Sequence, residues 1–168
     1  MRMRSFLVSL VLLALSLAAG AIVLAGPAVP PQAKAPATGS GGVLQSQEAD
    51  TPGVVAELIE CKRKEGVLSI KVRFRNTTNA AAFHRILAHR EYDHIYVTAA
   101  GEKYFLLKDS EGVFLTNQAD LGGSVAMHMA KGGSTVWWGK FPAPPADVKK
   151  INFTLPRVPP FDDIPITD

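Results

Sequence analysis

The stretch Val67–Arg75, VLSIKVRFR, decides the fold that the sequence predicts. Its apolar residues alternate strictly with polar ones: Leu68, Ile70, Val72 and Phe74 against Ser69, Lys71, Arg73 and Arg75. A period of two residues is typical of a β-strand with one buried and one solvated face. The turn formers of 76–79, NTTN, then predict the end of this strand.

Shorter apolar runs follow along the chain, and residues 151–155 alternate in the same way. We expect further strands at 94–98, 103–107, 113–116 and 135–141, separated by turn signals at 100–101, 109–112, 122–123 and 132–133. Only residues 80–89 could form a helical turn or two. Many short strands at such intervals predict an all-β fold, an immunoglobulin-like antiparallel β-sandwich.

The N-terminal region has the pattern of a secretory leader. Arg2 and Arg4 precede an uncharged apolar run over 6–26, so residues 1–26 are interpreted as a signal peptide or, if uncleaved, a signal anchor. Residues 27–53 are rich in Pro, Ala and Gly and are predicted to be a linker. The β-sandwich domain is expected over 54–168, outside the cytoplasm.

Net charge argues against nucleic-acid binding. The chain has 168 residues and a formal charge of +3, but Arg2, Arg4 and Lys34 precede every acidic residue. Beyond them, basic and acidic residues are equal in number, fifteen each. A nucleic-acid binder needs clustered cations to displace phosphate counterions, and the predicted domain has no such surplus.

Cys61 is the only cysteine, so the domain cannot form an internal disulfide. It lies in a short apolar-rich stretch, and we expect it to be buried. The core alone must then stabilise the domain.

Three motifs carry a resemblance to a known group of proteins. They are KYFLLKDSEG at 103–112, FPAPPADV at 141–148 and PFDDIPI at 160–166. The chain resembles a family of secreted bacterial immunoglobulin-like domains, mostly uncharacterised, whose patterns include F-P-A-P-P-A-D-V and P-F-x-D-V-P-I. The resemblance implies an extracytoplasmic β-sandwich of bacterial origin, and it carries over no catalytic residue to this chain. Members often have a cysteine shortly after the first motif, where this chain has Val113 and Phe114.

Two groups of residues are weak candidates for metal ligands. His84, His89 and His94 are close in sequence, but their spacing matches no zinc pattern. Met127, His128 and Met129 offer thioether and imidazole ligands that suit copper, although a strand would direct His128 away from both methionines. We therefore predict no metal and no cofactor, and periplasmic copper handling is the alternative function.

No serine has the setting of a catalytic nucleophile, so a small hydrolase is the least favoured reading and we predict a protein that is not an enzyme.

Trp137 and Trp138 must point to opposite faces of one strand. Trp137 shares its parity with Phe141 and should be buried, which leaves Trp138 and Lys140 outside as the predicted interaction site. The sequence thus predicts a monomeric, non-catalytic, exported binding module that contacts an envelope protein or another surface partner, with membrane attachment only through an uncleaved leader.

Overall fold

The computed structural model describes residues 42–168, so the predicted leader and most of the predicted linker lie outside the described residues. The described chain contains ten strands and one short 3₁₀ turn, η1 at Tyr92–His94. The strands are β1(Gln45–Glu48), β2(Val54–Lys64), β3(Val67–Asn76), β4(Ala82–Leu87), β5(Tyr96–Ala99), β6(Glu102–Phe105), β7(Val125–Met129), β8(Ser134–Pro142), β9(Lys150–Thr154) and β10(Phe161–Pro165).

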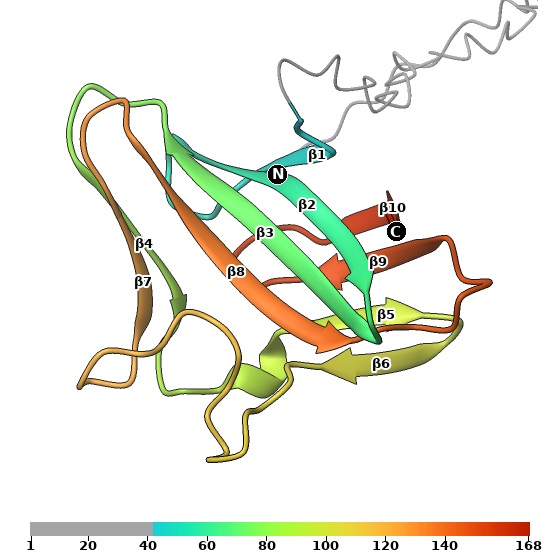
Figure 1. Ribbon diagram of the computed structural model, residues 1–168. Helices are drawn as coiled ribbons and strands as arrows, with labels where there is room; N and C mark the ends of the chain where they lie inside the picture. Colours follow the sequence, from blue (N-terminus) through green and yellow to red (C-terminus); the bar gives the residue numbers. More distant parts are fainter. Residues whose placement is uncertain (1–41) are drawn as a thin grey trace, which may run out of the picture. The chain divides into compact units, whose positions relative to one another are not determined.

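These strands form antiparallel sheets that pack against each other, which confirms the predicted β-sandwich. One sheet has the order β1-β2-β3-β8 and another the order β10-β9-β5-β6. Strands β4 and β7 form a separate two-stranded sheet. Figure 1 shows β2, β3 and β8 as three long neighbouring strands, with β5, β6, β9 and β10 on their far side.

Aromatic side chains join the two four-stranded sheets. Phe153 of β9 stacks on Trp137 of β8, with ring centroids 5.6 Å apart, and on Phe161 of β10 at 6.1 Å. Phe141 meets the same ring edge-on at 5.9 Å. All four rings are fully buried. Gly139 makes room for this cluster, because a Cβ there would lie 2.6 Å from the Trp137 ring.

The strand predicted at 67–75 is β3, with its apolar residues buried as expected. Its hairpin with β2 turns at Glu65 and Gly66, which both have positive φ, 51° and 79°. Two positive φ values give the two-residue turn whose twist suits a β-hairpin. The turn predicted at 100–101 has the same form, with φ of 50° and 82° at Ala100 and Gly101.

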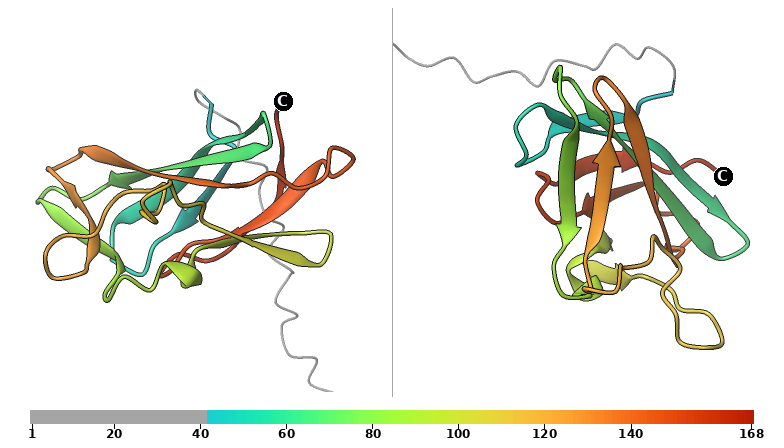
Figure 2. Two further views of the ribbon diagram at one scale, coloured as in Figure 1. Left: turned by 60° about the horizontal axis from the view of Figure 1, so that its bottom comes forward. Right: turned by 90° about the vertical axis from the view of Figure 1, so that its left-hand side faces the viewer.

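The two-stranded sheet is a continuation of the β3–β8 pair beyond a sharp corner (Figure 2). Asn76, which is buried, forms this corner. Its side-chain amide donates hydrogen bonds to the carbonyls of Ala80 at 2.7 Å and Ala130 at 2.9 Å. Its side-chain oxygen accepts from the backbone and hydroxyl of Thr78. The turn that the sequence predicts here therefore also redirects a pair of strands.

Three sequence predictions about elements are wrong. Residues 80–89 contain a strand, β4, and not a helical turn. Its side chains alternate as in a strand, with His84 and Ile86 buried and Phe83 and Arg85 exposed. Residues 113–116 form only isolated bridges, to Lys108 and to Gly139. The predicted linker of 27–53 extends too far, since its residues 45–48 form β1 and pair with β2.

The structure also contains β7, which the sequence patterns did not predict. Strand β10 is at one edge of its sheet, as expected for a strand that ends in Pro165. Phe161 and Ile164 of this strand are buried.

Candidate functional site

The two adjacent tryptophans of β8 face opposite sides of the sheet, as predicted. Trp137 is fully buried, whereas 37% of Trp138 is exposed. Burial alternates along this strand, so Lys140 is exposed together with Trp138. The predicted interaction residues therefore lie on one outer surface.

The backbone of Trp138 is fixed from both sides. On one side Trp138 pairs with Lys71 of β3. On the other, its N–H donates to the Asn117 side-chain oxygen at 2.9 Å, and its carbonyl accepts from the Thr116 hydroxyl at 2.7 Å. The loop at 107–117 thus covers the edge of β8 and fixes the backbone that carries the exposed indole.

A shallow pocket of about 210 Å³ adjoins the Trp138 ring. Glu60, Ser69, Lys71 and Lys140 contribute to its lining. Lys71 donates to Glu60 at 2.9 Å, which neutralises both charges. Within residues 42–168, Lys140 has no carboxylate partner, and neither does the exposed Lys62, whose register partner Ser69 also pairs with Lys140. We call the outer surface formed by Trp138, Lys140 and this pocket the Trp138 surface.

The predicted metal candidates are not brought together as the sequence grouped them. His84 is fully buried, whereas His89 and His94 are exposed. Met127 and Met129 are buried, and His128 is exposed on the opposite face of β7, edge-on to Phe83 at 4.9 Å. The three consecutive residues therefore cannot bind one ion together. The described residues contain no group of three or more His, Cys, Asp or Glu side chains suited to a metal.

A second pocket, of about 270 Å³, lies between loops at one end of the domain. It would favour the hydrolase reading if it collected a nucleophile and an acid–base pair. Its lining contains no His, Asp, Glu, Ser or Cys; it consists of Arg90, Tyr92, Gly112, Val113, Phe114, Gln118 and Ala119. This pocket does not support the hydrolase reading.

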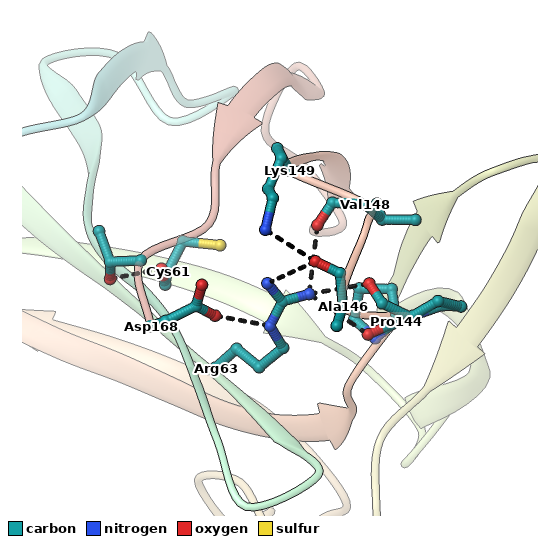
Figure 3. A network of polar contacts seen from close by, with 9 residues as sticks. Cys61, Arg63, Pro144, Ala146, Val148, Lys149 and Asp168 are labelled. Atoms are coloured by element: carbon teal, nitrogen blue, oxygen red, sulfur yellow. Dashed lines mark hydrogen bonds and ion pairs between the residues drawn. The ribbon is translucent and has the colours of Figure 1, made fainter.

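Arg63 links the second sequence motif to the C-terminal residue Asp168 (Figure 3). Its guanidinium donates to backbone carbonyls of the proline-rich motif, including Pro145 at 2.8 Å and Val148 at 3.2 Å. It also binds the Asp168 carboxylate at 2.7 Å. The hydrogen bond to Asp168 is the main reason that the pKa of Arg63 is raised and that of Asp168 is lowered. These motif residues are therefore structural: they attach the C-terminal tail to β2.

Arg63 belongs to none of the sequence motifs, although its position in β2 carries a signal. Arg63 has the same strand parity as Cys61, which is buried as predicted. Burial raises the pKa of the Cys61 thiol to about 12, so this thiol is not a nucleophile. An arginine at an inward parity position implies a set of acceptors nearby, and the motif carbonyls are those acceptors.

Comparisons with known proteins do not add a family. No family model, curated protein or solved structure matches the chain. Over residues 42–168, no helix has both the length and the apolar character to cross a membrane.

Proposed function

We propose that this chain is a non-catalytic, exported binding module of the bacterial envelope, and that it contacts a partner protein through the Trp138 surface. The observation that carries the proposal is the exposure of a tryptophan whose backbone is fixed on both sides. Single apolar residues are common on protein surfaces, but Val136 lies on the same face of β8 and is 39% exposed, so the apolar surface extends beyond Trp138. Tryptophan is also among the residues most enriched at binding hot spots.

The charge on this surface suggests the chemistry of the partner. Glu60 and Lys71 neutralise each other, which leaves Lys140 and the neighbouring Lys62 as cations without a carboxylate. A protein that places an apolar side chain on the indole and a carboxylate near Lys140 would match both features. The backbone of Trp138 is already ordered by these contacts, so binding needs little further backbone ordering here.

A comparative pull-down from envelope extract tests the binding proposal. The baits are the wild-type full-length chain, Trp138→Ala, Lys140→Glu and, as control, Phe105→Ala. Phe105 is also an exposed aromatic residue, 46% exposed, but it lies on β6 in the other sheet. Circular dichroism confirms that each bait is folded.

The proposal requires one protein that wild type and Phe105→Ala retain equally and that Trp138→Ala loses. A hot-spot loss of about 2 kcal/mol would weaken binding about 30-fold. Lys140→Glu should weaken it too, and raised salt should weaken the wild-type complex. The proposal would be overturned if all baits retained the same protein equally. It would also be overturned if the retained material resisted protease, because the partner would then not be a protein.

The export part of the proposal rests on the arginines and apolar run of 1–26. A reporter that is active only outside the cytoplasm, fused after residue 41, should be active. The fusion point precedes β1, so it leaves the described domain out of the test. A reporter confined to the cytoplasm would refute export without bearing on the Trp138 surface.

A further inference from the structure

The inner face of the β4–β7 sheet contains an unpaired buried nitrogen. His84 is fully buried, and its Nε2 atom has no hydrogen-bond partner. Buried polar groups are almost always paired, so each exception calls for an explanation such as an ion. This feature is separate from the Trp138 surface and does not depend on it.

The other ring nitrogen of His84, Nδ1, contacts polar side chains. Nδ1 lies 3.0 Å from the Thr51 hydroxyl oxygen and 3.5 Å from an oxygen of Asp50. The Thr51 hydroxyl also lies within 3.5 Å of the same Asp50 carboxylate, so this pair can accept the proton of His84 when the ring carries it on Nδ1. Arg157 holds the carboxylate with an ion pair of 2.6 Å. In the tautomer with the proton on Nδ1, the buried Nε2 carries the lone pair.

A histidine fixed in this way matches the usual setting of a metal ligand. Metal-bound histidines almost always donate their second ring N–H to a carboxylate, a carbonyl or water, which fixes the tautomer and orients the ring. Burial is the main reason that the pKa of His84 is lowered, and the neutral imidazole is the form that binds metals.

Two thioethers lie on the same inner face. Met127 is the direct register partner of His84, and Met129 is the partner of Ala82, two residues along the same face. Cβ atoms of directly opposed residues in an antiparallel pair are about 4.5–5.5 Å apart. Both methionines are buried, and the methionine side chain has three rotatable bonds, so its thioether adapts readily to a neighbouring group.

We propose that His84, Met127 and Met129 form a buried site for a soft monovalent cation, Cu(I). Thioether and imidazole ligands select this ion over the hard divalent cations. The site differs from the one suggested by the consecutive sequence Met127-His128-Met129, because β4 supplies the imidazole in place of His128. Asp50 and Thr51 act as positioning residues behind His84.

The test is a titration of the purified full-length chain with Cu(I), without oxygen, in competition with a chromophoric Cu(I) chelator. The variants are Met127→Leu, the double change Met127→Leu/Met129→Leu and, as matched control, His128→Asn. Leucine nearly conserves the volume of methionine, so the domain should stay folded, as circular dichroism will show. X-ray absorption of the copper complex reports its sulfur and nitrogen neighbours.

We expect one Cu(I) per chain, with nitrogen and sulfur neighbours. Met127→Leu should weaken the affinity at least about tenfold, because even residues behind the ligands contribute that much. The double variant should weaken it further, and His128→Asn should match wild type. Wild-type binding no tighter than micromolar, unchanged affinity in the double variant, or loss in His128→Asn would each overturn the proposal.

Discussion

Truncating Trp137 should damage stability far more than truncating its neighbour Trp138. Trp137 is fully buried and stacks on Phe153 at 5.6 Å, so its removal opens a cavity between the two sheets. Large buried aromatics cost about 3–5 kcal/mol when changed to alanine. The indole N–H of Trp137 has no hydrogen-bond partner, and losing an unsatisfied buried donor recovers about 1–3 kcal/mol. Trp137→Ala should therefore fall near the lower end, about 3 kcal/mol.

Trp137→Phe separates the two contributions. Phenylalanine keeps the aromatic contact with Phe153 and removes the unpaired N–H, while the lost volume costs about 1–2 kcal/mol. The opposing effects should leave stability within about 1 kcal/mol of wild type. Trp138→Ala removes a partly exposed side chain and should cost about 1 kcal/mol.

Equilibrium unfolding in guanidinium, followed by circular dichroism and fluorescence, measures all three variants. The chain has only two tryptophans, so each alanine variant reports on the remaining one. The indole left in Trp138→Ala should be shielded from iodide quenching, and the one left in Trp137→Ala should be accessible. Equal losses in the two alanine variants, or quenching in the reverse order, would refute the reasoning.

Two further predictions concern β2 and the C-terminal tail. Because burial raises the pKa of Cys61 to about 12, a thiol reagent near neutral pH should leave the native protein unmodified and label it fully after unfolding; stoichiometric native labelling would contradict this. Arg63 lowers the pKa of Asp168 below its ordinary value of 3.8, so the ionised carboxylate stabilises the fold above that pH and the contribution is lost as pH falls below it. In thermal melts across this range, wild type should therefore exceed Asp168→Asn near neutral pH and converge with it in acid, whereas a difference that does not change with pH would argue against the ion pair.

The sequence predicted the sandwich and the faces of its strands where alternation was strong. Leu68 to Phe74 and the pair Trp137 and Trp138 are the clearest cases, because a period of two fixes which side chains are buried. Residues 80–89 misled because the short run of alanines before Phe83 favours a helix in isolation. Only pairing with β7, a contact distant in sequence, makes that segment a strand.

The two candidate sites also differ in how far the sequence could predict them. Trp138 and Lys140 follow from local alternation within one strand, so the sequence was sufficient to place them together. His84 and Met127 meet only through the register of β4 with β7, which no local pattern encodes. Sequence proximity instead suggested His128, which the same alternation sends to the opposite face.

The two unpaired buried nitrogens of the described domain differ in what could satisfy them. Trp137 Nε1 and His84 Nε2 both lack partners, but an indole nitrogen is a donor only. No cation can bind this nitrogen. The free-energy penalty of the unpaired N–H is instead offset by the packing of the Trp137 ring beside Phe153. His84 Nε2 carries a lone pair once Thr51 and Asp50 hold the proton on Nδ1. Two thioethers, Met127 and Met129, are buried on the face of the β4–β7 sheet that carries His84, and thioether with imidazole is the chemistry of a soft cation. This difference makes His84 the stronger candidate for an unrecognised site.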